Sequence, residues 1–427
     1  MFKFKNILYI FLVLTILSVY FIPSVFADDL DDISENIDSN KTIQEQLLET
    51  STKSEKDSSL PSINSRSAIV LDRNSNTVLF GKNENEKLKM ASTTKIMTSI
   101  IVIENCNLTD TVEVSKKSAG TGGSRLGLKT GDKITVNDLL YGLMLCSGND
   151  AAVALAEFTS GSIEGFAELM NKKVKELNLE NTNFETPHGL DSANHYTTAY
   201  ELALLSKYAL DNETFLKIVG TKTKTITING YPKTISNTNE LLGNLNGVYG
   251  IKTGFTNGAN RCLVTACKRN NLDIICVVLG ADTKKFRTQD SIKLIEYSFK
   301  TYEPVNVQSI LDNEFNTWKK DNLDSFNIIK GENNNISLKL EKLEYPIIPI
   351  KKELKDKIRF TFECTKTLEA PVFQGFKIGN VRIELIDSTT SNILGYYDII
   401  VDSNINKKNG FTYFVEFLKQ YKKFAIF

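Results

Sequence analysis

The 427-residue chain has only two histidines and, among its six cysteines, no Cys-x-x-Cys pair. A zinc site is usually built from clustered cysteine and histidine ligands, so none is expected. Lysine plus arginine and aspartate plus glutamate each total 51, and this balance gives no reason to expect binding to nucleic acid. A Ser-His-Asp triad would need His188 or His195, but both lie among turn residues, and no Gly-x-Ser-x-Gly elbow accompanies them. We therefore interpret both histidines as loop residues.

The N-terminus is typical of an exported protein. Lys3 and Lys5 precede the apolar run 7–22, and Val25-Phe26-Ala27 places small residues where a signal peptidase would cleave. We expect a signal peptide over residues 1–27, with an uncleaved membrane anchor as the alternative. Residues 28–66 are acidic and serine-rich with few large apolar side chains, which predicts a disordered spacer.

Six cysteines in an exported protein would normally suggest disulfides. Cys262, Cys267 and Cys276, however, lie in apolar runs that resemble strands. Small buried thiols are therefore the main expectation. A single bridge between the runs that contain Cys267 and Cys276 is the alternative.

Residues 67–302 have the pattern of one α/β (α+β) domain. Two apolar runs in 67–82 flank a turn and predict a β-hairpin. Helical periodicity dominates residues 108–210, with its clearest segments at 136–141, 150–158, 163–177 and 198–210. Short strands are predicted at 221–228, 248–255, 261–267 and 272–280, and a closing helix at 289–300. Because the hairpin and the late strands can share one antiparallel sheet, we expect a sheet-and-helix sandwich.

The remaining residues divide into two segments. Residues 303–400 are poor in helix formers and contain alternating apolar runs, which predicts an all-β domain. In residues 401–427 one helical face is largely apolar and aromatic, with Phe411, Phe414, Val415, Leu418, Tyr421 and Ala425. Lysines on the opposite face make this segment suitable for the surface of an anionic membrane. The alternative is a terminal helix packed on the β domain.

The stretch Ala91-Ser-Thr-Thr-Lys95 is the first candidate for chemistry. In the first turn of a helix, this spacing brings the Ser92 hydroxyl and the Lys95 amine onto one face. The residues from Ile96 to Ile103 are apolar on nearly every side, which predicts a helix buried all round. Burial would favour the neutral amine, which is the form that can take the serine proton. The same spacing also occurs by chance as a helix cap and a solvated lysine, so the motif needs partners.

Two further motifs supply those partners. Ser147-Gly148-Asn149 precedes the helical run 150–155, and Lys252-Thr253-Gly254 ends a predicted strand. Gly254 would leave room for a peptide beside that strand. In this order and setting, the three motifs resemble the signature of penicillin-binding proteins and serine β-lactamases.

The residue types fit acyl transfer, which needs a nucleophile, a base, oxyanion donors and a proton for the leaving amine. Ser92 would attack, and neutral Lys95 would serve as the base. Ser147 and Lys252 would relay a proton to the leaving nitrogen. Asn149 would hydrogen-bond the substrate amide.

Within this superfamily the chain is most similar to the low-molecular-mass penicillin-binding proteins, the serine-type D-alanyl-D-alanine carboxypeptidases. The middle motif is Ser-Gly-Asn, as in that family. The resemblance covers about residues 67–300 and rests on four stretches: Ala91–Lys95, Gly123–Asp132, Asp138–Ala152 and Gly250–Gly254.

The resemblance implies an oxyanion hole made by the backbone amides of Ser92 and Phe255, although relatives often have histidine in place of Phe255. It also implies that Arg287 contacts the terminal carboxylate of the substrate, a task that suits the bidentate guanidinium. A following β domain, an amphipathic C-terminal anchor and the absence of any metal or cofactor are implied as well. The expected substrate-binding residues are Asn149, Thr253, Gly254, Phe255 and Arg287.

The expected function is that of an exported, membrane-associated D,D-carboxypeptidase at the outer face of the cytoplasmic membrane or in the cell wall. Ser92 would attack the penultimate D-alanine carbonyl of the peptidoglycan stem pentapeptide, and water would hydrolyse the acyl-enzyme. β-Lactam antibiotics mimic the dipeptide and should acylate the same serine.

Three alternatives remain open. A D,D-endopeptidase or a β-lactamase could use the same scaffold, but loop 180–194 has Glu180, Glu185 and Asp191 without a Glu-x-x-x-Asn arrangement. The third alternative is a non-catalytic penicillin-binding sensor or wall-binding protein.

Overall fold

The computed structural model describes residues 60–387 and 391–424, and the chain divides into two compact units. The described residues of the first unit are 60–73 and 78–298, and those of the second are 74–77 and 299–424 without 388–390. The predicted signal peptide and most of the predicted spacer lie outside the described residues. The end of that spacer contains the buried Ser65, whose backbone N–H and hydroxyl both donate to Asp290. The last residues of the predicted spacer therefore pack against the first unit.

The first unit is built on a five-stranded antiparallel sheet in the order β2-β1-β9-β8-β7. Its hairpin strands are β1 (Ser67–Asp72) and β2 (Val78–Lys82), and its late strands are β7 (Val248–Thr256), β8 (Asn260–Arg269) and β9 (Leu272–Ala281). The prediction that the hairpin and the late strands share one sheet is confirmed. β7 is an edge strand of this sheet.

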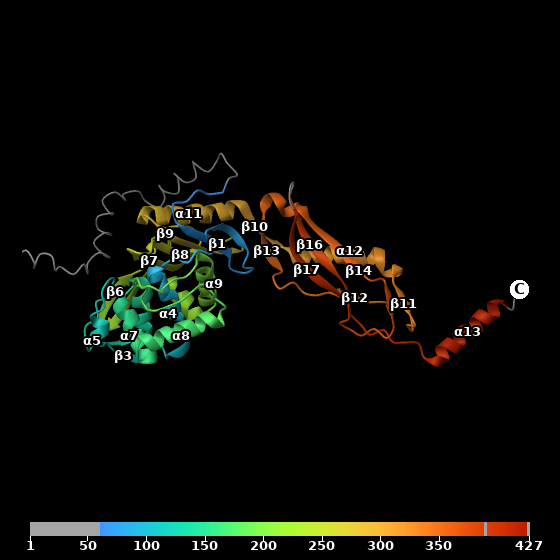
Figure 1. Cartoon of the computed structure of the whole chain (residues 1–427), viewed down its shortest axis with the longest axis horizontal. Coiled ribbons are helices and arrows are strands. Elements are labelled where there is room, and N and C mark those ends of the chain that lie inside the picture. Colours follow the sequence, from blue (N-terminus) through green and yellow to red (C-terminus); the bar gives the residue numbers. More distant parts are fainter. Residues whose placement is uncertain (1–59, 388–390, 425–427) are drawn as a thin grey trace, which may run out of the picture. The chain divides into compact units, whose positions relative to one another are not determined.

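Helices cover both faces of the sheet in the first unit. In Figure 1, α11 (Lys284–Thr301) lies along one face and the helical segment lies on the other. That segment comprises η3 (Ala91–Thr94), α4 (Lys95–Asn105), α5 (Lys116–Ala119), α6 (Val136–Leu145), α7 (Asn149–Ser160), α8 (Ile163–Glu176), α9 (Ala199–Leu210) and α10 (Glu213–Val219). The sheet-and-helix sandwich is thus confirmed, and the predicted helices end within a few residues of the observed ones.

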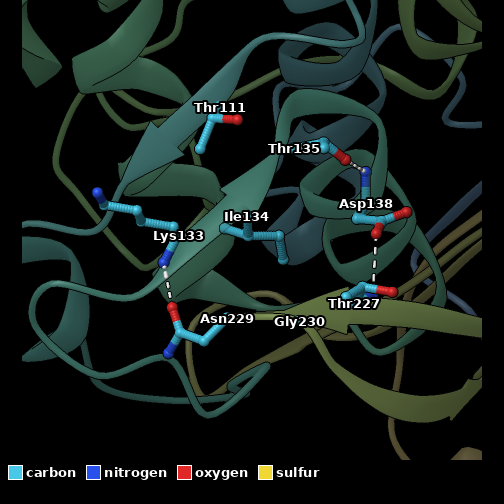
Figure 2. A pocket seen from close by; sticks show the side chains of 8 residues that line it. All are labelled: Thr111, Lys133, Ile134, Thr135, Asp138, Thr227, Asn229 and Gly230. Atoms are coloured by element: carbon cyan, nitrogen blue, oxygen red, sulfur yellow. Dashed lines mark hydrogen bonds between the residues drawn. The ribbon is translucent and has the colours of Figure 1, made fainter.

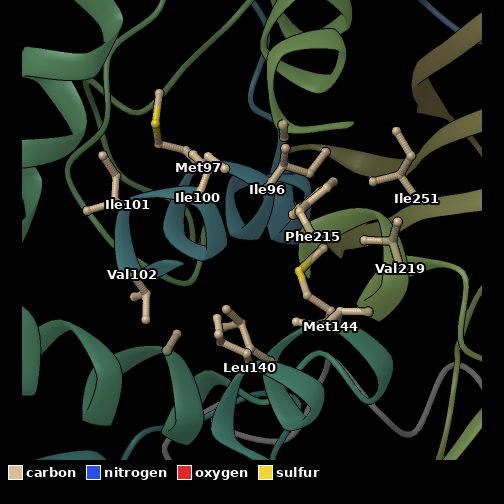
Figure 3. Packing of buried hydrophobic residues seen from close by; sticks show 14 of the residues in the cluster. Ile96, Met97, Ile100, Ile101, Val102, Leu140, Met144, Phe215, Val219 and Ile251 are labelled. Atoms are coloured by element: carbon tan, nitrogen blue, oxygen red, sulfur yellow. The ribbon is translucent and has the colours of Figure 1, made fainter. Parts of the chain in front are cut away.

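Helix α4 forms the centre of the core. Every residue from Lys95 to Val102 is buried. Figure 3 shows its apolar side chains among residues of α6, α10 and β7, namely Leu140, Met144, Phe215, Val219 and Ile251. Burial of a large aliphatic or aromatic side chain stabilises a fold by roughly 1.5–3 kcal/mol, so this helix is a rigid part of the unit.

The strand predicted at 221–228 does not join the main sheet. It is β5 (Thr223–Ile228), which pairs with β6 (Tyr231–Ser236) in a separate hairpin. Its alternation of threonine and isoleucine gives it only one apolar face, whereas β8 and β9 are buried along almost their whole length. A strand with one apolar face is better placed at the periphery.

A second small hairpin, β3 (Thr111–Glu113) with β4 (Lys133–Thr135), lies beside the first. Figure 2 shows the bond that joins them, from the Lys133 N–H of β4 to Asn229 in the turn between β5 and β6. It also shows the Thr227 N–H of β5 donating to Asp138 of α6. Between the two hairpins is an open pocket of about 500 Å³.

The second unit is rich in β-structure, as predicted, and contains a four-stranded sheet in the order β12-β17-β16-β14. Its strands are β10 (Tyr302–Asn306), β11 (Asn327–Ile329), β12 (Leu338–Leu340), β13 (Ile347–Lys351), β14 (Ile358–Cys364), β15 (Thr367–Glu369), β16 (Lys377–Ile386) and β17 (Ser391–Val401). Its helices are α12 (Val307–Asn322), α13 (Gly410–Phe424) and the short η4 (Leu323–Ser325) and η5 (Lys352–Lys357).

Helix α12 shows that the second unit is not all-β. Val307, Leu311 and Phe315 recur every fourth residue and are buried, so the helix has a narrow apolar stripe. Trp318 stacks against Phe315 and Phe362, with ring centroids 5.7 and 5.3 Å away. Because the other residues of this helix are mostly polar, the composition of the segment did not indicate a helix.

All six cysteines are free thiols, and Cys262, Cys267 and Cys276 are buried. The prediction of buried thiols is confirmed, and the alternative bridge between Cys267 and Cys276 is not formed. In the part of the chain that the structure describes, no helix is both long and apolar enough to cross a membrane.

A fully buried carboxylate fixes the start of α7. The two carboxylate oxygens of Asp150 accept hydrogen bonds from the backbone N–H groups of Leu126, Gly127, Leu128 and Ala151, at 2.7–2.9 Å. Loop 126–128 is therefore tied to the turn between α6 and α7.

Replacement of Asp150 by Asn should lower the free energy of unfolding by about 3 kcal/mol, because an amide N–H₂ would face backbone donors that are buried. Urea unfolding of the two proteins measures this difference. The matched control is Asp211→Asn, since Asp211 is 64% exposed in its ion pair with Arg73. That change should cost less than about 1 kcal/mol. Equal losses in the two variants would contradict the structural role of Asp150.

Candidate active site

Ser92 lies in η3, the turn that leads directly into α4. Its side chain is partly exposed, whereas Ala91 and Thr93 on either side are buried. Ala91 adopts a left-handed backbone conformation with φ of 49°, which is uncommon for a residue other than glycine. The Thr94 hydroxyl donates to the Ala91 carbonyl at 2.8 Å. The turn thus presents one hydroxyl at the end of a buried helix.

The Lys95 amine connects three parts of the chain. Its Nζ lies 2.8 Å from Ser92 Oγ, 2.7 Å from Asn149 Oδ1 and 2.8 Å from the His188 carbonyl oxygen. A neutral amine has two N–H donors and one lone pair. The carboxamide and carbonyl oxygens can accept the two N–H groups, which leaves the lone pair for the Ser92 O–H. After proton transfer the ammonium would still have three acceptors, so the predicted nucleophile and base are well arranged.

Asn149 is held by residues 122–124, which lie in the loop between α5 and β4. Its N–H donates to the Ser124 carbonyl and its Nδ2 donates to the Gly122 carbonyl, both at 2.8 Å. Because Oδ1 faces Lys95, the carboxamide supports the amine directly. The second N–H of Nδ2 is the group that could reach a substrate.

Lys252 is the second buried lysine of the site. Its Nζ donates to the Thr253 carbonyl at 3.0 Å. Burial lowers the pKa of Lys252 to about 7; the nearby Cys146 thiol opposes this shift, and the positive charge of Arg287 adds to it. Lysine at this pKa can both bind and release a proton near neutrality.

Cys146, the residue before Ser147, and Lys252 each affect the pKa of the other, so the turn that contains Ser147 lies near this amine. Ser147 is buried and has a positive φ of 60°. Within residues 60–387 and 391–424, its hydroxyl forms no hydrogen bond. The relay from Ser147 to Lys252 therefore stays a prediction.

Strand β7 packs directly against the Ser92 turn. A Cβ atom at Gly254 would lie 3.1 Å from Ser92 N and 3.1 Å from Ala91 Cβ. We expected this glycine to leave room for a peptide, and the structure shows instead that it makes room for the nucleophile turn. The contact also brings Ser92 N next to the residue before Phe255, as an oxyanion hole made by both amides requires.

The neighbours of Gly254 are held in place by their own contacts. Thr253 is buried, and its hydroxyl is 2.7 Å from that of Thr238. Phe255 is partly buried, with the Arg261 guanidinium 3.7 Å from its ring centroid. Both side chains therefore fix the end of β7.

Arg287 is buried near the start of α11, and its Nη2 lies 3.0 Å from Glu240 Oε1. Glu240 also accepts from Thr288 and lies 3.5 Å from Lys284. Burial would raise the pKa of Glu240, but the Arg287 and Lys284 charges and the Thr288 bond outweigh it, so the pKa is lowered. Among the described residues, Arg287 Nε has no hydrogen-bond partner. The predicted carboxylate-binding residue thus has an internal carboxylate and a free donor.

Nothing in the sequence indicated that His195 and its loop support the Ser92 turn. His195 Nδ1 accepts from the Glu185 N–H at 3.0 Å, so the ring proton is on Nε2, which donates to Thr94 Oγ1 at 2.7 Å. Gly189 has φ of 89°, and a Cβ atom there would lie 1.9 Å from the Ala91 carbonyl oxygen. Loop 185–195 therefore packs against the nucleophile turn. No periodic pattern marks a contact between segments so distant in the chain.

The histidines are loop residues, as predicted, but they are buried. Burial lowers the pKa of His188 to about 3 and that of His195 to about 4, so both rings are neutral at neutral pH. The bonds of His195 go to Thr94 and Glu185, which fits a positioning role and not a triad.

The acidic residues of the same loop bond elsewhere. Asp191 accepts from the Thr256 hydroxyl and the Gly258 N–H, and Glu185 accepts from Ser192 and Asn194. In the described residues, no group of three or more His, Cys, Asp or Glu side chains could hold a metal ion.

Comparison with known proteins agrees with this geometry. A family model described as D-alanyl-D-alanine carboxypeptidase matches residues 52–283. The chain is 41% identical over 244 residues to D-alanyl-D-alanine carboxypeptidase DacF of Bacillus subtilis, and 42% identical over 258 residues to DacC of Escherichia coli. These alignments cover 56% and 57% of this chain, and the chain spans 63% and 64% of the two relatives.

A solved structure extends the similarity to most of the chain. Penicillin binding protein 5 from Haemophilus influenzae matches with a TM-score of 0.67 at 29% identity. The match covers 82% of this chain and 100% of that one.

The lowered pKa of Lys252 predicts a pH-dependent stability. Between the folded value of about 7 and the ordinary value of 10.5, the unfolded chain binds a proton that the folded one does not, so stability should rise with pH across this interval. Each pKa unit corresponds to roughly 1.4 kcal/mol. Lys252→Met should remove the free-energy cost of holding a charged amine in the buried site. The variant should therefore be more stable than wild type, with the largest difference below pH 7.

Urea unfolding at pH 6.5 and pH 10 measures this effect. Lys129→Met, a change at an exposed lysine, is the control and should leave the pH dependence unchanged. A stability difference between wild type and Lys252→Met that is the same at both pH values would contradict the lowered pKa.

Proposed function

The chain belongs to the D-alanyl-D-alanine carboxypeptidase family, and we propose that it is a serine-type enzyme that removes the terminal D-alanine from peptidoglycan stem pentapeptides. The observation that carries this proposal is the 2.8 Å contact between Lys95 Nζ and Ser92 Oγ, with Asn149 and His188 as the other acceptors of the amine. A serine and a buried amine arranged in this way form an activated nucleophile. The family is the one that the three motifs predicted.

The reaction proceeds through an acyl-enzyme. Lys95 takes the Ser92 proton as Oγ attacks the penultimate D-alanine carbonyl, and the amides of Ser92 and Phe255 bind the oxyanion. Ser147 and Lys252 pass a proton to the leaving D-alanine nitrogen as the C–N bond breaks. Water then attacks the ester and restores the serine. A β-lactam would follow the same first step and remain attached.

Two features of the site would position the substrate: the edge strand of the sheet and the positive charge of Arg287. β7 is an edge strand, so an extended peptide can add alongside it through backbone hydrogen bonds. Arg287, whose Nη2 already binds the carboxylate of Glu240, would bind the terminal carboxylate of the substrate. Thr253 and Asn149 would contact the peptide between these points.

We also propose that the protein is exported and that α13 attaches it to the outer face of the cytoplasmic membrane. Phe411 is 76% exposed, Phe414 58% and Phe417 62% on this helix. Lys419 on the same helix is exposed as well. Exposed aromatic side chains with lysines nearby are typical of helices that lie in an anionic lipid interface.

The nucleophile is tested by intact-mass analysis of residues 28–427 with and without benzylpenicillin. Wild type should gain one drug mass, Ser92→Ala should gain none, and release of D-alanine from a pentapeptide should fall by about 10⁴-fold or more in the variant. Retention of the fold is checked by circular dichroism.

Other results would point to other functions. An adduct without D-alanine release would indicate a penicillin sensor, and an adduct that hydrolyses within seconds would indicate a β-lactamase. Absence of any adduct in the folded protein would contradict the assignment of Ser92.

The ion pair between Glu240 and Arg287 predicts an effect on substrate binding. Glu240→Gln removes the internal carboxylate, so Arg287 should bind the substrate carboxylate better and KM should fall by about fivefold, while kcat changes little. Steady-state release of D-alanine measures both constants.

The control is a substrate with an amidated C-terminus, for which Glu240→Gln should change KM very little. Arg287→Gln should raise KM for the carboxylate substrate and not for the amide. A higher KM in Glu240→Gln would contradict the idea that Glu240 competes with the substrate carboxylate for Arg287. It would indicate that Glu240 positions the arginine.

A further inference from the structure

Three large apolar side chains are exposed at one end of the second unit. Phe373 is 66% exposed, Phe376 53% and Ile329 43%. Phe373 and Phe376 belong to the turn that precedes β16, and Ile329 ends β11. Such exposed phenylalanines contribute little to the core, so the fold alone does not account for them.

Backbone hydrogen bonds place these side chains beside the segment that leads into α13. Val372 and Ile405 exchange two bonds, at 3.0 and 2.8 Å. Lys408 N–H donates to the Lys330 carbonyl at 2.9 Å, directly after Ile329. Because α13 begins at Gly410, two residues beyond Lys408, its first turn is attached to the same end of the unit as the exposed side chains.

Helix α13 does not cover these side chains, since its own Phe411 and Phe414 are 76% and 58% exposed. Both sets of apolar side chains therefore keep a large part of their surface exposed. A common lipid surface would bury both.

Amines lie next to the apolar side chains of the turn. Lys377 directly follows Phe376 and is 56% exposed in its ion pair with Asp398. Lys407 is exposed on the segment that bridges to Gly331. Lysine stems beside inserted apolar groups, with the amines toward the headgroups, are the arrangement that an anionic lipid surface favours.

We propose that the Phe373–Phe376 turn and Ile329 form a second membrane contact, which inserts into the lipid interface together with α13. This inference rests on the proposed attachment of α13 and extends it. Once α13 is bound, insertion of the turn is intramolecular, so its effective concentration is high and even a small apolar area contributes. Two points of attachment fix the orientation of the second unit, which a single terminal helix would leave free to rotate.

The test uses residues 28–427 and vesicles of phosphatidylglycerol and phosphatidylethanolamine in a sedimentation assay. Phe373→Ser/Phe376→Ser should bind about tenfold more weakly than wild type. The matched control is Ile393→Ser/Tyr396→Ser, two side chains of β17 that are 51% and 57% exposed. Ile393 is eight residues from Val401, the strand residue that bonds to Phe376, or about 26 Å along the strand. The control should bind like wild type.

A fluorescence measurement reports insertion directly. The sequence has one tryptophan, Trp318, so Phe376→Trp adds a single probe to a known background. Its added emission should be quenched by lipids brominated on the acyl chains, and the emission of wild type should not.

Phe411→Ser/Phe414→Ser separates this inference from the attachment of α13. Both proposals are supported if this variant loses vesicle binding, Phe373→Ser/Phe376→Ser binds more weakly than wild type, and the added emission of Phe376→Trp is quenched. If Phe373→Ser/Phe376→Ser binds vesicles as tightly as wild type, and the added emission of Phe376→Trp is not quenched, the second contact is overturned and α13 remains the anchor. Folded wild type that acylates with benzylpenicillin but does not bind vesicles overturns both. If the added emission of Phe376→Trp is already shielded from water in the absence of vesicles, the contact is also overturned, because a protein surface would then cover the turn.

Discussion

The site depends on one buried amine that must have partners. Lys95 is fully buried, and an amine in that position without acceptors would cost several kcal/mol in lost hydration. Its hydrogen-bond partners come from three separate segments: the η3 turn, the start of α7 and the loop that contains His188. Each segment is fixed in turn, because Asp150 ties the start of α7 to loop 126–128 and Gly189 packs against the Ala91 carbonyl. The geometry of the nucleophile is thus a consequence of how the fold satisfies this amine.

The two buried lysines differ in their surroundings, and this difference suits them to the two roles that we propose. Lys95 has two oxygens that can only accept, together with a hydroxyl that can give a proton, which suits a base. Lys252 has a bond to the Thr253 carbonyl and the positive charge of Arg287 nearby, and its pKa is about 7. An amine that titrates near neutrality suits the return of a proton to a leaving group. Environments that separate similar groups in this way are how one site supplies both a base and an acid.

Local patterns in the sequence predicted the elements better than the contacts between them. The hairpin, the apolar helix after Ser92 and the three motifs are visible because each is encoded within about a dozen residues. The bond between His195 and Thr94 and the pair of Glu240 and Arg287 join residues 101 and 47 positions apart, and no periodicity marks them. Gly254 illustrates the same limit, because its small size was evident but the neighbour that requires it was not. In α12, the apolar stripe was present and the polar composition concealed it.

The charges around Arg287 explain why the site has an internal carboxylate. Arg287 is buried beside the partly exposed Lys284, and its charge also lowers the pKa of Lys252. Without a bound anion, this concentration of positive charge would be unfavourable in a region from which water is largely excluded. Glu240 offsets it in the resting protein, at the expense of competition with any carboxylate that enters. If Arg287 binds the substrate carboxylate, as we propose, that carboxylate would gain only the difference between its own contacts and those of Glu240. On this proposal, the affinity of the site for its substrate would depend as much on the internal ion pair as on the arginine itself.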